Sequence, residues 1–273
     1  MSDAAPIDTA LRRSLEGKVA LVTGVGPNIG SEIALRLAQC GATVACNDLS
    51  QEAAMATVAR LEAEGGSAFP AVGDVADPES VQRMVAEVLD RTDRIDVLVN
   101  NAAVTVPKGI LDSSYEEFCK VTDVILNGIF LMSQAVATAM VERGTHGAIV
   151  NIASTSGHRG RRNAVAYCAA KGGVLNMTRA MACDLAEHGI RVNSVSPTKT
   201  GASVGALESA KGRDVSEIPL GRAGEPVDQA RAVVFMASEL AGFVTGEDLR
   251  VDGGSLATWG TRSHATLQPA GAS

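Results

Sequence analysis

Tyr167 and Lys171 stand at the two ends of the segment YCAAK, in a stretch made otherwise of small side chains. On a helix, residues four positions apart share a face, so the lysine amine can lie close to the phenol. A nearby ammonium favours the phenolate and lowers the tyrosine pKa from its reference value of about 10 towards a working pH. The spacing therefore predicts a phenol that acts as a base, provided that the chain supplies a substrate.

The segment TGVGPNIG, residues 23–30, is a second candidate site. Its three glycines follow an apolar run and precede a helical pattern, as in a turn between a strand and a helix. Such glycines let the backbone bend sharply and approach a pyrophosphate, whose charge the helix N-terminus stabilises. We therefore predict a dinucleotide-binding loop, and the alternative is a plain glycine-rich turn. The predicted binding residues are Gly24, Gly26, Asn28, Ile29 and Gly30.

Asp48 ends the second apolar run, 18 residues after Gly30. A carboxylate at that point can accept hydrogen bonds from both ribose hydroxyls of an adenosine and repels a 2′-phosphate. The sequence has no arginine or lysine within several residues of Asp48 or inside residues 23–30. Asp48, with Leu49 beside it, therefore predicts NAD rather than NADP. The alternative interpretation of Asp48 is a turn residue before LSQE.

These residues need elements that bring them together. Apolar, strand-like runs occur at 19–24, 42–48, 68–74, 95–102, 147–154 and 190–197. Helical patterns lie between and after them, near 30–40, 51–64, 78–91, 115–143, 163–187 and 226–240. Runs that are apolar throughout and are separated by helices indicate a parallel sheet covered on both faces. The predicted fold class is α/β, a doubly wound, Rossmann-like sheet in a single domain, which binds ligands at the carboxyl ends of its strands.

The composition fits one large globular domain and argues against several function classes. Hydrophobic residues make up 46% of the 273 positions and charged residues 20%, which leaves little room for extended disorder. A net charge of −7 argues against a nucleic-acid or anionic-membrane surface. The scattered cysteines and histidines lack metal-ligand spacing, so no metal is predicted. Because the N-terminus has no secretory h-region and no 18-residue apolar run occurs, we expect a cytoplasmic protein.

The order and spacing of these motifs resemble those of the short-chain dehydrogenase/reductase family. The resemblance covers about residues 18–255, and Ser154 lies 13 residues before Tyr167, as it does in the family. The motifs that carry it are TGVGPNIG, GDV at 73–75, NNAA at 100–103, Asn127, Ser154, YCAAK, NSVSP and VDGG at 251–254. Several independent motifs in the family's order make the match specific.

The resemblance implies a catalytic set of Asn127, Ser154, Tyr167 and Lys171. In similar enzymes the tyrosine takes the hydroxyl proton of a substrate alcohol while a hydride leaves the same carbon for C4 of the nicotinamide. Ser154 is expected to hydrogen-bond the substrate oxygen, and Lys171 to hold the nicotinamide ribose as well. Asn127 is expected to hold a water that relays protons. As a polar amide in an apolar run, it needs some partner in any case.

Further cofactor contacts are implied with less force. Asp74 and Val75 match the family's adenine-contacting pair, Asn100 begins the motif beside the adenosine ribose, and Thr200 is a guess for the carboxamide. Either asparagine of NNAA could equally satisfy backbone groups at a strand end. Tyr167 and Lys171 belong to the cofactor set as well as to the catalytic one.

Three positions depart from the family's pattern. Asn28 replaces a glycine in the first loop, but asparagine tolerates left-handed backbone angles, so its amide is expected to reach the phosphates. The last residue of NNAA, Ala103, places a methyl group near the cofactor, and Thr198 follows Pro197 where the family has glycine. We expect binding to survive with altered geometry.

The remaining segments frame the expected catalytic domain, residues 16–255. Residues 1–15 are an N-terminal extension, 256–273 a tail, and 198–219 the expected substrate lid. The cluster HRGRR lies between the serine and the tyrosine, near the mouth of the site. Its arginines, Arg159, Arg161 and Arg162, could grip an anionic substrate group, and we favour a solvated or subunit-facing cluster.

The resulting hypothesis is an NAD-dependent oxidoreductase that interconverts a secondary alcohol and its ketone, with Tyr167 as acid and base. The alcohol is a sugar, a polyol, or a cyclic or small polar alcohol. The alternatives are a 3-oxoacyl-thioester reductase, against which Asp48 and the lack of a basic patch argue, and a catalytically silent NAD-binding sensor or scaffold. The small residues of 164–175 favour a dimer or tetramer, or else packing within the chain. The substrate, its stereochemistry and the physiological direction stay open.

Overall fold

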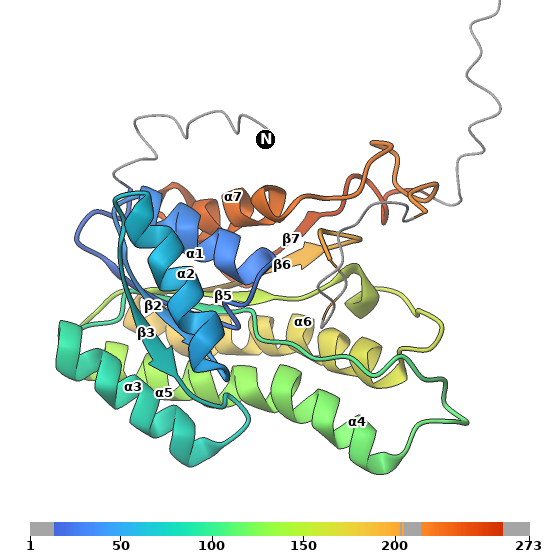
Figure 1. Cartoon of the computed structure of the whole chain (residues 1–273), viewed down its shortest axis with the longest axis horizontal. Helices are drawn as coiled ribbons and strands as arrows, with labels where there is room; N and C mark the ends of the chain where they lie inside the picture. Colours follow the sequence, from blue (N-terminus) through green and yellow to red (C-terminus); the bar gives the residue numbers. More distant parts are fainter. Residues whose placement is uncertain (1–13, 203, 205–213, 259–273) are drawn as a thin grey trace, which may run out of the picture.

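The computed structural model describes residues 14–202, 204 and 214–258, and they form a parallel sheet between two layers of helices (Figure 1). The strands of the sheet are β1 (Val19–Thr23), β2 (Thr43–Asp48), β3 (Ser67–Val72), β4 (Val97–Asn100), β5 (Ala148–Ile152), β6 (Arg191–Pro197) and β7 (Asp248–Val251). Their order is β3-β2-β1-β4-β5-β6-β7, and every neighbouring pair is parallel. The predicted doubly wound α/β fold is confirmed.

Helices cover both faces of this sheet (Figure 1). One layer holds α1 (Ile29–Gln39), α2 (Gln51–Ala63) and α7 (Pro226–Ala237), and the other holds α3 (Pro78–Thr92), α4 (Tyr115–Thr122), α5 (Gly128–Glu142) and α6 (Val165–Leu185). Short turns complete the order: η1 (Asp123–Asn127), η2 (Thr155–Gly157), η3 (Ala186–His188) and η4 (Glu239–Ala241). Because both faces are covered, β1, β4 and β5 are buried at every residue, which explains their unbroken apolar runs.

Three features differ from the sequence expectation. The edge strand β7 was not predicted, because it is only partly buried and lacks an apolar run. The expected helix at 115–143 is divided by the π-helical turn η1. Leu15 is 2% exposed and its N–H donates to the Cys40 carbonyl at 3.1 Å, so the domain includes this residue of the expected 1–15 extension.

The strand order reverses direction at β1, which pairs with β2 on one side and with β4 on the other. Strands β2 and β3 lie on one side of β1, and β4 to β7 lie on the other. Such a change in strand order opens a crevice at the carboxyl ends of the strands. The glycine-rich loop follows β1, Asp48 ends β2, and Ser154 comes two residues after β5. The fold therefore gathers the predicted site residues along one edge of the sheet.

The continuous helix from Tyr115 to Glu142 is long and apolar enough to cross a membrane by length and composition, with a mean hydropathy of 1.8. However, 56% of that window is buried inside the domain. Burial of this kind is typical of a helix that packs on a sheet, and the helix contacts β4, α3 and α6.

Candidate active site

Ser154 and Tyr167 meet at the carboxyl end of β5. Ser154 begins the turn η2, where its hydroxyl accepts a hydrogen bond from the Ser156 N–H at 3.1 Å. Tyr167 lies in the first turn of α6 and hydrogen-bonds to the Ser154 side chain. Each of the two residues is 8% exposed. The structure therefore brings the two predicted hydroxyl groups together in a nearly buried position.

Lys171 lies beneath this pair, one helical turn after the tyrosine. Its amine is 5.8 Å from the centroid of the Tyr167 ring and donates a hydrogen bond to the Ile152 carbonyl. The residue is 2% exposed, and burial lowers the pKa of its amine to about 7. The predicted shared helical face is present, but the lysine is only partly charged near neutral pH.

The expected acidification of the phenol by Lys171 stays a prediction. Burial raises the pKa of Tyr167, and the hydrogen bond from Ser154 and the positive charge of Arg161 offset that rise only in part. The physical reason is that the interior disfavours a phenolate and an ammonium alike, so the lysine loses much of the charge that would act on its neighbour. The nearby positive charge comes instead from the arginine, whose guanidinium carbon lies 5.1 Å from the ring centroid.

Asn127 is placed differently from the expectation. It ends the π-helical turn η1, its side chain is exposed, and its amide donates to the Asp123 carboxylate at 2.8 Å. The amide therefore has the partner that we expected, but it is not a buried group in an apolar run. The turn itself packs on α6, where Leu126 fills the space left by Gly173.

The glycines of the first loop have two different reasons to be there. Gly24 has a φ of +65°, and a Cβ on it would lie 2.7 Å from the Ala102 Cα. A Cβ on Gly30 would lie 2.1 Å from the Gly24 carbonyl oxygen. A Cβ on Gly26, in contrast, would meet only the Asp48 carboxylate, at an ordinary 3.5 Å. Packing inside the protein requires two of the glycines, whereas at the third, Gly26, there is space for a Cβ.

Thr23, which sequence reasoning missed, and Asn101, for which a contact to backbone groups was one of the two interpretations, hold this loop. The Thr23 hydroxyl accepts hydrogen bonds from the backbone N–H groups of Asn101 and Ala102, at 3.0 and 3.1 Å. The Asn101 amide donates to the carbonyl of Gly24 at 2.7 Å. The available signal was a polar residue at the end of each of two apolar strand runs. Their side chains fasten the glycine loop to the segment after β4.

Asp48 lies beside the same loop with both carboxylate oxygens oriented. One oxygen accepts from the Gly26 N–H at 3.0 Å and the other from the Ser50 N–H at 3.0 Å. The residue is partly exposed, and Leu49 after it is 72% exposed. This carboxylate at the carboxyl end of β2 fits the ribose position of a dinucleotide bound at the β1–α1 turn.

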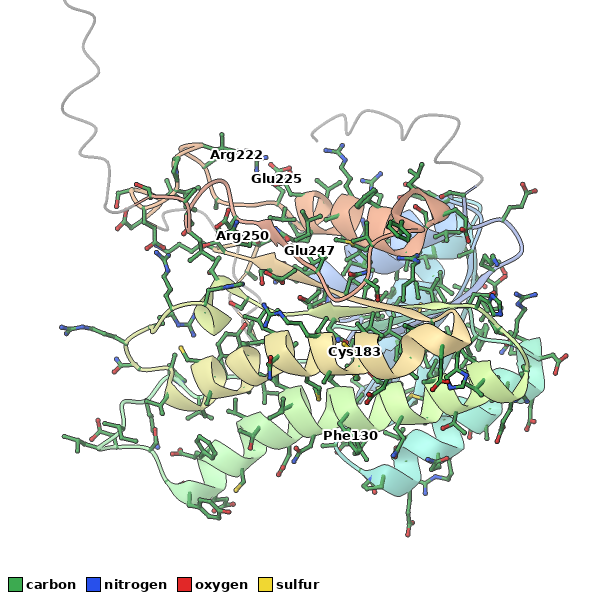
Figure 2. All side chains as sticks on the ribbon, turned by 180° about the vertical axis from the view of Figure 1, so that it is seen from behind. Phe130, Cys183, Arg222, Glu225, Glu247 and Arg250 are labelled. Carbon is green, nitrogen blue, oxygen red and sulfur yellow. The ribbon has the colours of Figure 1, made fainter. Side chains whose placement is uncertain are left out.

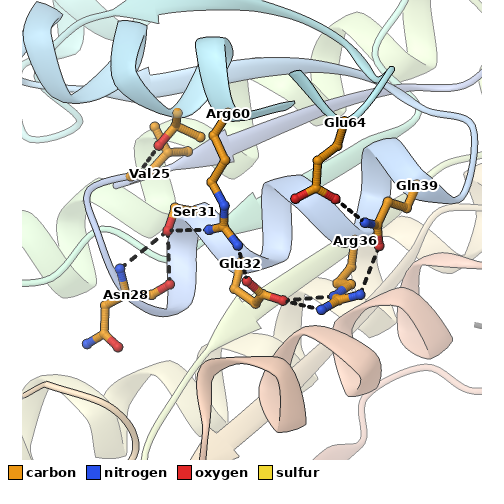
Figure 3. Close-up of polar contacts among 9 residues, drawn as sticks. Val25, Asn28, Ser31, Glu32, Arg36, Gln39, Arg60 and Glu64 are labelled. Carbon is orange, nitrogen blue, oxygen red and sulfur yellow. Dashed lines mark hydrogen bonds and ion pairs between the residues drawn. The ribbon is translucent and has the colours of Figure 1, made fainter. Parts of the chain in front are cut away.

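An ion-pair network supports α1 from α2 (Figure 3). The Glu32 carboxylate forms ion pairs with the guanidinium groups of Arg60, at 2.6 Å, and of Arg36, at 2.7 Å. Burial acts to raise the pKa of Glu32, but the hydrogen bonds and charges of the two arginines outweigh it and hold the pKa below its usual value. Arg60 also reaches the Ser31 hydroxyl at 3.5 Å, which puts a cation near the glycine loop. The sequence interpretation missed this cation because it lies 12 positions after Asp48.

Asn28 does not direct its amide to a phosphate position as expected. The amide donates to the Ala202 carbonyl at 2.9 Å and so ties the glycine loop to the segment after β6. The Asn28 backbone has a φ of +152°, a strained conformation for any residue but glycine. Its carbonyl and N–H both contact the Ser31 hydroxyl, which stabilises the entry into α1.

Two further predicted cofactor residues use their side chains inside the protein. Asn100 is 2% exposed, and its amide donates to the Ser133 hydroxyl at 3.0 Å and to the side-chain oxygen Oδ1 of Asn151 at 2.9 Å. Thr200 is 5% exposed and accepts from the Gln229 amide at 3.2 Å. Each of these side chains faces a buried polar partner, and the adenosine contact of Asn100 and the carboxamide contact of Thr200 stay predictions.

The loop after β3 holds the predicted adenine pair. The Asp74 carboxylate accepts from the Ala76 N–H at 2.8 Å, and its own N–H donates to the Ser80 hydroxyl. Val75 is 6% exposed, and its side chain would lie 3.1 Å from a Cβ on Gly128, so it packs closely on the start of α5. Ile29, the first residue of α1, packs partly buried on the core. Ala103 packs on the apolar cluster of α4 and α6.

Part of the cluster HRGRR between the serine and the tyrosine makes contacts within the protein. Arg159 donates to the Ser255 hydroxyl at 2.9 Å and pairs with Glu217 at 3.3 Å, so it joins the catalytic loop to the C-terminal segment. The ring of His158 lies 2.9 Å from the Asp248 carboxylate on β7. Ten of the 22 residues of the expected lid, 203 and 205–213, lie outside the described residues.

The small residues of α6 pack within the chain. A Cβ on Gly173 would lie 2.9 Å from the Leu126 side chain, and a Cβ on Gly157 would lie 2.6 Å from the Lys171 carbonyl. The alternative of intrachain packing therefore holds for Gly173, which packs on η1, and the close approach of Gly157 in η2 packs that turn against α6.

A cavity of about 400 Å³ lies far from this site. Lys18, Asp96, His146 and Arg191 help to line it, and they precede or begin β1, β4, β5 and β6. It therefore opens at the amino ends of the strands, the edge opposite the glycine loop and Ser154. The lining of this cavity includes none of the predicted catalytic or cofactor residues.

Comparison with known proteins gives consistent matches. A family model described as enoyl-(acyl carrier protein) reductase matches residues 24–255. The 3-oxoacyl-(acyl-carrier-protein) reductase of Thermotoga maritima is 38% identical over 88% of this chain and 98% of its own length. The meso-2,3-butanediol dehydrogenase of Serratia marcescens is 38% identical over 90% and 97%. A crystal structure of gluconate 5-dehydrogenase from Burkholderia cenocepacia, in complex with NADP and tartrate, aligns with a TM-score of 0.84 and 35% identity over 91% of this chain and 99% of that one.

Proposed function

Because the chain belongs to the short-chain dehydrogenase/reductase family of oxidoreductases, we propose that it interconverts a secondary alcohol and its ketone with NAD. The observation that carries the proposal is that the nearly buried Ser154 and Tyr167 meet at the carboxyl end of β5, beside the buried Lys171. This arrangement lies on the same edge of the sheet as the glycine loop. A binding protein without chemistry has no need for a buried phenol paired with a second hydroxyl.

The site residues have the following proposed roles. Ser154 and Tyr167 bind the carbinol oxygen of the substrate, and the Tyr167 oxygen takes its proton during oxidation and returns one during reduction. Lys171 holds the ribose next to the nicotinamide with its amine hydrogens. Asn127 is proposed to relay protons to solvent from its exposed position at the end of η1. The nicotinamide, when bound, supplies the position that accepts or gives the hydride.

The described residues fit a dinucleotide. The space beside Gly26 and the N-terminus of α1 suit a pyrophosphate, and the oriented carboxylate of Asp48 suits two ribose hydroxyls. The charge of Arg60 does not neutralise the Asp48 carboxylate, because the Arg60 guanidinium forms an ion pair with Glu32 at 2.6 Å. These contacts support NAD as the cofactor, although the gluconate 5-dehydrogenase neighbour was crystallised with NADP.

Replacing Asp48 by alanine should shift the preference between the two cofactors. Removal of the carboxylate removes its repulsion of a 2′-phosphate and its bonds to the ribose, so the ratio of kcat/KM for NAD over NADP should fall by about 10- to 100-fold. Steady-state kinetics with both cofactors measures this ratio. Glu52→Ala, in the exposed first turn of α2, is the charge-matched control and should leave the ratio unchanged. An unaltered ratio in Asp48→Ala would count against the NAD assignment.

The substrate is proposed to be a small polar secondary alcohol, such as a sugar, a polyol or a cyclic alcohol. The names of the butanediol and gluconate dehydrogenases support this class. The name of the 3-oxoacyl reductase supports the alternative, a 3-oxoacyl thioester. A net charge of −7 disfavours docking of an acidic carrier protein and therefore favours the small alcohol.

The proposed function is tested by following absorbance at 340 nm. The full-length protein is mixed with NAD and a panel of secondary alcohols, and in the reverse direction with NADH or NADPH and ketones or a 3-oxoacyl thioester. NADH formation with a polar alcohol is the expected result. Exclusive NADPH-dependent reduction of the thioester would favour the alternative. Tight NAD binding without turnover of any substrate would favour a sensor or scaffold.

We also propose that the protein is a cytoplasmic homo-oligomer, a dimer or a tetramer. Exposed apolar side chains support this, among them Tyr115 at 81% and Phe130 at 49% on the α4–α5 helix, and Phe243 after η4. Phe130 on α5 and Cys183 on α6 face the same side of the molecule (Figure 2). Light scattering distinguishes the 28.0 kDa monomer from an assembly.

A further inference from the structure

Arg161 is the arginine of the catalytic loop that contacts the phenol. Its guanidinium carbon lies 5.1 Å from the centroid of the Tyr167 ring. The neighbouring Arg159 is engaged with Ser255 and Glu217. In the part of the chain that the structure describes, no carboxylate lies within ion-pair distance of Arg161. Its charge is therefore not neutralised by the residues described around it.

The local backbone explains how this arginine reaches the tyrosine. Asn163 has a φ of +54°, a left-handed conformation that asparagine adopts more readily than most residues. The chain turns there and enters α6 at Val165, so that Arg161 comes to lie over the first helical turn. Arg161 is exposed whereas Tyr167 is 8% exposed. The guanidinium thus lies between solvent and the buried phenol.

A guanidinium in this position is suited to bind a carboxylate. Its N–H groups form a planar fork that matches the two oxygens of a carboxylate, and a group that stacks on an aromatic ring keeps those edges available. Lys199, a described cation inside the expected lid, already pairs with Glu217 at 3.0 Å. An anionic substituent on a substrate held by Ser154 and Tyr167 therefore finds Arg161 as its available partner.

We propose that Arg161 binds a carboxylate of the substrate and so selects hydroxy acids, and the corresponding oxo acids, over uncharged alcohols. The carboxylate belongs on a carbon close to the carbinol carbon, since the guanidinium and the phenol that takes the proton are in contact. The inference rests on the proposed function, and it names the substrate class of the same site. Arg161 is a specificity-determining residue, and the proton transfer stays with Tyr167.

The test compares matched substrates that differ only in charge. For the wild type and for Arg161→Gln, Arg161→Lys and Arg162→Gln, kcat/KM with NAD is measured on a polyhydroxy acid, on its primary amide and on the corresponding polyol. Wild type should prefer the acid by at least about tenfold, the strength of one charge-assisted contact. Arg161→Gln should lose that preference through KM, Arg161→Lys should keep part of it, and the exposed neighbour Arg162→Gln should keep all of it.

A binding measurement separates this inference from the proposed function. The hydroxy acid should raise the Tm of the NAD-saturated wild type more than its amide does, and Arg161→Gln should lose the difference. That result supports the carboxylate site even if no turnover is found, in which case the proposed function alone fails. The inference is overturned if wild type treats acid and amide equally in both measurements. Equal losses on acid and polyol in Arg161→Gln, with an unchanged Tm difference, would also overturn it and reduce Arg161 to a support of Tyr167.

Discussion

Tyr167→Phe is expected to lower kcat by about 10³-fold, within the range usual for loss of a general acid–base group. Phenylalanine keeps the ring that packs beneath Arg161 and removes only the oxygen that bonds to Ser154. The protein should therefore fold and bind NAD as before, because the oxygen supports the proton transfer and not the packing. The measurement is the rate of NADH formation with the best alcohol of the panel, together with Kd for NAD.

The chain offers a matched control for this change. Its other tyrosine, Tyr115, begins α4 and is 81% exposed, so Tyr115→Phe should leave kcat unchanged. A kcat of Tyr167→Phe within tenfold of wild type would refute the assignment of the phenol as acid and base. The same loss in Tyr115→Phe would show that the effect does not depend on the site.

Gly30→Ala is expected to destabilise the protein even without cofactor. The new Cβ would lie 2.1 Å from the Gly24 carbonyl oxygen and 2.6 Å from the Asn101 amide nitrogen, so α1 or the loop has to shift. Overpacking of this kind costs about 3 kcal/mol of the free energy of unfolding, which corresponds to a fall in Tm of roughly 6–12 °C for a domain of this size. Calorimetry of the protein without NAD measures it.

Gly26→Ala is the matched comparison in the same loop. Its Cβ would meet only the Asp48 carboxylate at 3.5 Å, so the Tm without cofactor should stay within about 2 °C of wild type. The added methyl stands where the proposed function brings a pyrophosphate close to the backbone, and the affinity for NAD should therefore fall by at least about tenfold. Equal Tm losses in the two variants, or none in Gly30→Ala, would contradict the division between packing glycines and a ligand-facing glycine.

Much of the fold was predictable because its signals are local. Alternation of apolar runs with amphipathic segments reports which stretches are covered on both faces, and it located β1 to β6 and the helices between them. The partly exposed edge strand β7 lacks that signal, since only one side of it is paired. The division of the 115–143 helix by η1 was also missed, because a π-helical turn has no periodicity of its own at this length.

In the candidate site, too, the features with a local sequence signal were predictable and the others were not. Spacing along the chain placed Tyr167 and Lys171 on one helical face, and the position of Asp48 at the end of a strand placed it beside the glycine loop. Which way a side chain turns was not predictable from spacing. Asn100 faces the buried Ser133 and Asn151, because a strand-end residue can turn towards the interior or the crevice with the same sequence signal.

The sequence by itself determined the doubly wound sheet, the edge that carries the site, and the types of residue gathered there, because hydrophobic periodicity and helical spacing are short-range properties. Only the tertiary structure decided which groups are charged and which contacts they make. The amide of Asn28 reaches Ala202, 174 positions away, and burial lowers the pKa of Lys171 to about 7, while the positive charge at Tyr167 comes from Arg161. These outcomes depend on burial and on contacts between distant segments, which arise only when the layers pack.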